Sequence, residues 1–140
     1  MMRPDPASLL LDTHAWVWLN LGVELSERSL QAIEQAAASG GLWVSVISVW
    51  EVSLLHAKGR LRFGMSCIDW VERALAPPVV LATLTPIIAV ESNALPAAFH
   101  DDPADRMITA TARVGGHTLL TRDRLLLGYS GQGHLAALAC

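Results

Sequence analysis

Four short motifs, far apart along the 140-residue chain, each place an acidic residue after an apolar run or a turn signal. These residues are Asp12 in Leu-Leu-Leu-Asp-Thr, Glu51 in Ser-Val-Trp-Glu, Asp105 in Asp-Pro-Ala-Asp-Arg and Asp123 in Leu-Leu-Thr-Arg-Asp. Open α/β sheets bind ligands at the edge where strands end and helices begin. Carboxylates at that edge can meet in space, and their hard oxygen atoms are the ligands that Mg²⁺ or Mn²⁺ requires.

Such a cluster suits hydrolysis of a phosphodiester bond. The reaction needs an activated water, a stabilised leaving oxygen and a neutralised phosphate, and one or two metals held by carboxylates supply all three. We therefore predict catalytic and metal-binding roles for all four acidic residues, with Asp123 as a second-site or water-mediated ligand. The hydroxyl groups of Thr13 and Thr121 flank the cluster and are candidates to bond a metal-bound water or a ligand carboxylate.

Helix capping is the alternative explanation for each carboxylate, because acidic residues are favoured near helix N-termini. Asp12 would cap the helix after the first strand. Ser48 and Glu51 have the spacing of a capping box. Asp102 would be an N-cap with Asp105 at the third helical position, and the acidic residue of the fourth motif would lie in a first helical turn. The argument for chemistry therefore rests on the four motifs together.

Basic residues follow the motif that contains Glu51. Lys58, Arg60 and Arg62 are candidates to contact phosphates. An equally good explanation is a solvated loop whose cations complement the C-terminus of the preceding helix. The five histidines share no metal-binding spacing, so the sequence gives no support for a zinc site.

The overall composition indicates a compact globular domain. Apolar residues make up 52% of the chain and charged residues 16%, and the net charge is −3, which argues against broad, non-specific coating of DNA. Residues 1–6 contain no apolar signal core, and the apolar stretch 79–90 is too short to cross a bilayer. With two cysteines in no metal-binding spacing, we expect a single cytoplasmic domain, residues 1–140, with reduced thiols and no membrane association.

Strand-like and helix-like segments alternate along the chain. Strands are predicted at 9–11, 42–46, 79–82 and 117–121, with a further edge strand at 135–138. Helices are predicted from about 15, 26, 47, 66, 85, 103 and 122, and Ser26, Thr85 and Asp102 are N-cap candidates. This alternation predicts a three-layer α/β/α domain around a central parallel sheet of four to five strands.

The motifs, taken in order, resemble those of the PIN domain, and within it those of the VapC toxins of bacterial toxin–antitoxin pairs. The matching stretches are 9–18, 44–51, 95–106 and 118–123. The resemblance implies a Mg²⁺- or Mn²⁺-dependent ribonuclease, usually dimeric and inhibited by a cognate VapB-like antitoxin, with the acidic site residues at Asp12, Glu51, Asp105 and Asp123. The chain departs from the family pattern at Ala104, where relatives often have Phe, and in lacking an aromatic residue soon after Asp123.

The function that we infer from the sequence is a metal-dependent endoribonuclease toxin. A non-catalytic RNA- or partner-binding module with the same fold is the alternative, and a DNA-directed, structure-specific nuclease is a third possibility. Cleavage of RNA that a chelator abolishes would separate the first from the second. We also expect a homodimer, and an antitoxin segment that covers apolar surface near Trp16, Trp50 and Leu54.

Overall fold

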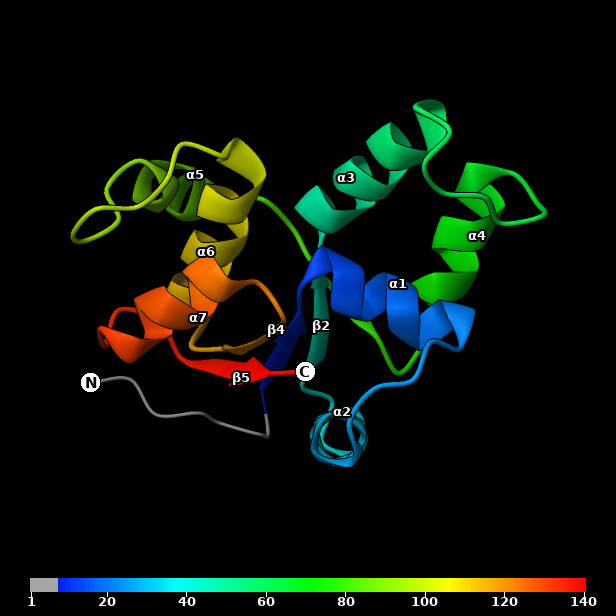
Figure 1. Cartoon of the computed structure of the whole chain (residues 1–140), viewed down its shortest axis with the longest axis horizontal. Coiled ribbons are helices and arrows are strands. Elements are labelled where there is room, and N and C mark those ends of the chain that lie inside the picture. The colour runs from blue at the N-terminus through cyan, green and yellow to red at the C-terminus, as the bar shows by residue number, and fades with distance from the viewer. Residues whose placement is uncertain (1–7) are drawn as a thin grey trace.

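In the computed structural model, which describes residues 8–140, five short strands form one parallel sheet (Figure 1). The strands are β1 (Leu9–Leu11), β2 (Leu42–Ser45), β3 (Val80–Ala82), β4 (Thr118–Thr121) and β5 (Ala137–Ala139). Their order across the sheet is β3-β2-β1-β4-β5, and all four pairings are parallel. The predicted parallel sheet is confirmed. The sequence prediction for residues 1–6 lies outside the described residues.

Helices cover both faces of the sheet, which gives the three layers that the sequence predicts (Figure 1). The helices are α1 (Thr13–Leu21), α2 (Glu27–Ala38), α3 (Val46–Ala57), α4 (Cys67–Ala74), α5 (Pro86–Ser92), α6 (Pro103–Gly115) and α7 (Arg124–Gly131). Side chains from α1, α2, α3 and α4 join the core on one face. Side chains from α6 and α7 join it on the other, and α5 packs on α6.

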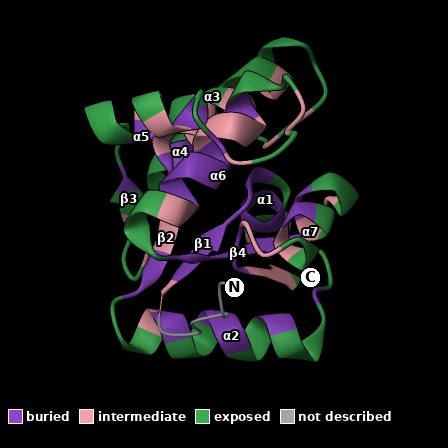
Figure 2. Ribbon diagram, turned by 90° about the vertical axis from the view of Figure 1, so that its left-hand side faces the viewer, coloured by how far each residue is buried: buried purple, intermediate pink, exposed green. Residues whose placement is uncertain are grey.

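The central strand β1 supplies both cores. Leu9 and Leu11 belong to the cluster with α1 to α4, whereas Leu10 belongs to the cluster with α6 and α7, and all three are fully buried. This alternation follows from the two-residue period of a strand. A strand buried on both faces has to be apolar at every position, which explains the continuous leucine run. Figure 2 shows buried residues along β1 and β4 and exposed residues on the outer side of α2.

Trp16 is part of this core, which corrects one sequence prediction. Its side chain is 0% exposed, it packs against Trp70, and its indole N–H donates to the carbonyl oxygen of Ala74 at 3.0 Å. It is therefore absent from any surface that a partner could cover. The other two residues of that prediction, Trp50 and Leu54, are 56% and 38% exposed.

The predicted N-caps at Ser26, Thr85 and Asp102 are confirmed, because each side chain accepts from the backbone N–H three residues later. The start of α3 differs from the prediction. Ser45 ends β2 in an extended conformation, and its hydroxyl accepts from the N–H of Ile47 at 3.0 Å. The helix therefore begins at Val46, and the predicted strand was one residue too long.

Three helices begin within three residues of a strand end: α1 follows β1, α3 follows β2 and α7 follows β4. Since β1 lies between β2 and β4, these three helix N-termini gather at the carboxyl edge of the sheet. Helix α6 packs against α3, which brings a fourth N-terminus to the same edge (Figure 1). Within residues 8–140, no helix has the length and apolar character needed to cross a membrane.

Candidate active site

An open pocket of about 470 Å³ lies at this edge of the sheet. Its lining side chains come from all four acidic motifs and their surroundings: Asp12, Thr13, His14, Trp18, Glu51, Asp102, Asp105, Arg122 and Asp123. The structure thus brings together all four acidic residues that the sequence singled out, although they are spread from position 12 to position 123 of the chain. Their chemical roles stay predictions.

Asp12 is the most deeply placed of the carboxylates, at 8% exposed. Its Oδ1 accepts from the backbone N–H of Thr13 at 2.8 Å, which makes Asp12 the N-cap of α1. Its Oδ2 accepts from the hydroxyl of Thr121, at the end of β4, at 2.6 Å. Capping therefore accounts for one carboxylate oxygen, whereas the other is held by a residue from a neighbouring strand.

Glu51 reaches the pocket from the second turn of α3. Its Oε1 accepts from the hydroxyl of Thr13 at 2.5 Å, and that hydroxyl also lies 2.8 Å from the hydroxyl of Ser48. Because the Thr13 proton points to Glu51, the Ser48 hydroxyl must be the donor in the second bond. The predicted capping box of Ser48 and Glu51 is wrong, since Ser45 caps α3; the pair instead meets at Thr13.

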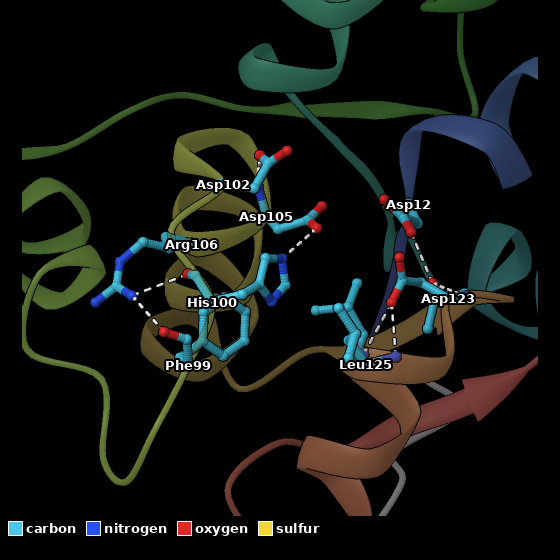
Figure 3. Close-up of polar contacts among 10 residues, drawn as sticks. Asp12, Phe99, His100, Asp102, Asp105, Arg106, Asp123 and Leu125 are labelled. Atoms are coloured by element: carbon cyan, nitrogen blue, oxygen red, sulfur yellow. Dashed lines mark hydrogen bonds and ion pairs between the residues drawn. The ribbon is translucent and has the colours of Figure 1, made fainter.

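Asp105 lies in the first turn of α6 and extends toward the side of the pocket where Asp12 and Asp123 lie (Figure 3). Its Oδ2 is 2.7 Å from Nε2 of His100. Asp102 caps α6, because its Oδ1 accepts from the backbone N–H of Asp105 at 3.1 Å. His100 is thus a site contact that the sequence analysis did not single out. Arg106 has a structural role, because its guanidinium group donates to three backbone carbonyls.

Asp123 is the N-cap of α7, and not a first-turn residue as the capping alternative supposed. Its Oδ1 accepts from the backbone N–H groups of Leu125 and Leu126 at 2.8 and 3.1 Å (Figure 3). The predicted helix start at Arg122 is therefore two residues too early, because Thr121 and Asp123 first form a tight turn in which the Thr121 hydroxyl accepts from the Asp123 N–H.

The carboxylates perturb one another's protonation. Burial is the main cause that raises the pKa of Asp12, Glu51 and Asp105 above their ordinary values. For Glu51, the charges of Asp12, Asp105 and Asp102 raise the pKa further. The hydrogen bonds from Thr121, Thr13 and His100 oppose these effects, one for each carboxyl group.

The donor set fits a hard divalent cation. Its members are carboxylate oxygens, and a bound cation would offset both the burial and the mutual repulsion that raise their pKa values. Among residues 8–140, no three Asp, Glu, His or Cys side chains already stand together as a preformed metal site, so joint coordination requires these carboxylates to turn toward a shared ion. Oδ2 of Asp12 accepts a hydrogen bond from the Thr121 hydroxyl, and Oδ2 of Asp105 is in contact with Nε2 of His100.

The predicted basic residues lie elsewhere. Lys58 is the C-cap residue of α3, and Lys58, Arg60 and Arg62 are all exposed and none of them lines the pocket. The cation that does line it is Arg122, which the sequence reasoning did not select. Trp18 and His14 were also missed as site residues, although their spacing of four places both on one face of α1.

The PIN domain family model matches residues 9–129. The chain belongs to the PIN domain family. Among characterised relatives, ribonuclease VapC22 of Mycobacterium tuberculosis (strain ATCC 25618 / H37Rv) is 38% identical over 120 residues, which cover 85% of this chain and 89% of that protein.

Several solved structures have the same fold at low sequence identity. A chain of VapBC2 from Rickettsia felis, solved with a promoter DNA fragment, has a TM-score of 0.68 at 12% identity and covers 94% of this chain and 97% of its own. DNA-bound VapBC from Salmonella typhimurium gives 0.68 at 14% identity, with coverage of 99% and 98%. FitAcB from Neisseria gonorrhoeae gives 0.62 at 19% identity, with coverage of 93% and 96%.

Proposed function

We propose that this PIN-domain chain is a Mg²⁺- or Mn²⁺-dependent endoribonuclease that acts in the cytoplasm as the toxin of a type II toxin–antitoxin pair. One observation carries the proposal: carboxylates from four separate motifs line a single open pocket at the carboxyl edge of the sheet. The likeness to ribonuclease VapC22 supports the same reaction class.

Asp12, Glu51 and Asp105 would hold the metal, with Asp123 as a second-site or water-mediated ligand. When bound, the metal supplies an activated water and neutralises the substrate phosphate. The hydroxyl groups of Thr13 and Thr121 have a positioning role, because each holds a carboxylate oxygen by a hydrogen bond of 2.5 or 2.6 Å. His100 does the same for Asp105. These contacts limit the side-chain motion that would otherwise have to be lost when a metal binds.

The partners that we propose are an RNA substrate, a VapB-like antitoxin and a second copy of the chain. The antitoxin would cover the apolar surface of α3 that includes Trp50 and Leu54, since both side chains are exposed beside the pocket residue Glu51. Toxin–antitoxin complexes with this fold support the antitoxin. Light scattering across micromolar concentrations tests the homodimer, and a stable monomer throughout would contradict it.

The test of the reaction uses the purified chain with a pool of single-stranded RNA and, in parallel, a flapped DNA duplex. We expect Mn²⁺ to support RNA cleavage and EDTA to abolish it, with little cleavage of the DNA. RNA binding without cleavage at any Mg²⁺ or Mn²⁺ concentration would favour the non-catalytic module. Preferential cleavage of the flapped duplex would favour a DNA-directed nuclease.

A further inference from the structure

One wall of the acidic pocket is made by an arginine and a tryptophan. The guanidinium carbon of Arg122 lies 4.3 Å from the ring centroid of Trp18, within the range of a cation–π interaction. The Nε–H of Arg122 donates to the main-chain oxygen of Cys140 at 2.9 Å. The backbone N–H of Cys140 in turn donates to the carbonyl oxygen of Thr121 at 3.1 Å, which connects Arg122 to the end of β4.

These two contacts orient the guanidinium group without occupying all of its donors. Arg122 is exposed, and within residues 8–140 the hydrogen-bonding partner of its guanidinium group is Cys140, through the main-chain oxygen and the thiol, so several of its five N–H donors stay available. A guanidinium group is a planar fork that recognises phosphate oxygens through paired N–H groups. Contacts on Nε and on one ring face reduce the freedom that an arginine side chain loses when it binds a ligand.

The charge of the pocket gives this arginine a specific task. Five carboxylates line the pocket, those of Asp12, Glu51, Asp102, Asp105 and Asp123. A polyanion approaching them is repelled, and Arg122 is the permanently charged cation among the lining residues. The exposed cations at 58, 60 and 62 do not reach this space.

We propose that Arg122 binds a backbone phosphate of single-stranded RNA beside the acidic cluster, and that Trp18 is the positioning residue that holds its guanidinium group. The inference rests on the proposed ribonuclease function. Arg122 would anchor the strand next to the nucleotide at the carboxylates, so the arginine contributes to substrate binding and the carboxylates to the reaction.

Binding is measured by fluorescence anisotropy with a labelled phosphorothioate RNA 12-mer, in Mg²⁺, over a range of salt concentrations. Arg122→Gln removes the charged hydrogen bond to the phosphate, so we expect RNA binding to weaken about tenfold or more. It also lowers the slope of log K against log [salt] by about 0.7, the value for one phosphate of a single strand. Arg122→Lys should recover little, because an ammonium group lacks the fork and the stacking face.

Arg124→Gln is the matched control. Arg124 is an exposed cation two residues away, at the start of α7, and lines a different cavity with Phe99 and His100. Its neutralisation changes the net charge equally, so it reports any long-range electrostatic effect. We expect binding within about twofold of the unaltered protein.

Trp18 is tested through a double-mutant cycle. Trp18→Leu should weaken RNA binding less than Arg122→Gln does, and Trp18→Phe should retain most of the affinity. The double variant should bind as Arg122→Gln alone does, because Trp18 acts through the arginine. Losses that add in the double variant would overturn the positioning role.

The outcomes separate this inference from the proposed function. If the unaltered protein cleaves the RNA pool and Arg122→Gln binds like Arg124→Gln, the phosphate contact is wrong and the ribonuclease function stands. If the unaltered protein neither binds nor cleaves RNA, the proposed function fails, and the inference with it. Melting curves without metal must be the same for all variants, since a folding defect would produce the same loss of binding.

Discussion

Replacing Asp105 with Asn separates a metal ligand from a helix-terminal charge. Asn has nearly the same shape and retains a hydrogen-bonding atom for His100, and Asp102 continues to cap α6. Without metal, the change removes a favourable charge–dipole interaction of about 0.3–1 kcal/mol. It also removes a charge that burial and the neighbouring carboxylates disfavour, as the raised pKa of Asp105 indicates. These effects oppose each other, so the metal-free variant should melt within a few degrees of the unaltered protein.

The effect with metal is larger. A ligand at 100 times its Kd stabilises the folded state by about 2.7 kcal/mol, which for a domain of this size raises the melting temperature by roughly 10 °C. Without the anionic oxygen of Asp105, the same Mn²⁺ concentration should give less than half of that shift, and RNA cleavage should be lost. Asp101→Asn is the control, because Asp101 is exposed and does not line the pocket.

The pH dependence provides an independent check. A carboxyl group whose pKa is raised in the folded state binds more protons there than in the unfolded chain. The metal-free protein should therefore gain stability as the pH falls through the folded pKa, with the gain complete near the unfolded value of 3.8. Asp105→Asn should reduce this gain. A variant that keeps the full Mn²⁺ shift, full cleavage and the original pH profile would refute the acidic-cluster hypothesis at its central residue.

Gly115, His117 and the exposed cations after α3 can each be tested by substitution. A Cβ atom at Gly115 would lie 2.3 Å from Nε2 of His117, whose ring is buried and held by Ser8. Gly115→Ala should therefore destabilise the protein by about 1–3 kcal/mol in denaturant titrations, despite the usual gain of ~1 kcal/mol from helix propensity. In a His117→Ala background, Gly115→Ala should no longer lower the stability, and a stabilised single variant would contradict the clash. Burial lowers the pKa of His117, so just below pH 6.5 the unfolded chain binds more protons than the folded protein does. The free energy of unfolding should therefore decrease as the pH drops through that range. The melting temperature of His117→Gln, measured over the same pH range, should lack this part of the decrease. Neutralising Lys58, Arg60 and Arg62 together should weaken RNA binding and flatten its salt dependence, while stability and Mn²⁺ affinity stay unchanged. An unchanged salt slope would show that these residues form a solvated loop at the end of α3 that does not contact RNA.

Local signals in the sequence were enough to predict the elements of the fold. The continuous run Leu9–Leu11 indicated a strand buried on both faces, and Ser26, Thr85 and Asp102 marked helix starts that the structure confirms. These signals involve residues a few positions apart, so they can be read without knowledge of the rest of the chain. The errors arose where two local explanations competed. Ser45 and Ser48 both suited the cap of α3, and the turn after β4 moved the start of α7.

The sequence by itself determined which carboxylates were candidates, since each follows an apolar run or a turn signal. Only the tertiary structure decided what surrounds them. Because β1 pairs with both β2 and β4, Asp12 meets Thr121 across 109 positions of the chain, and Thr13 meets Glu51 across 38. The pairing of Arg122 with Trp18 depends on the same strand order. Strand order is set by the packing of the whole core, and no short window of sequence contains that information.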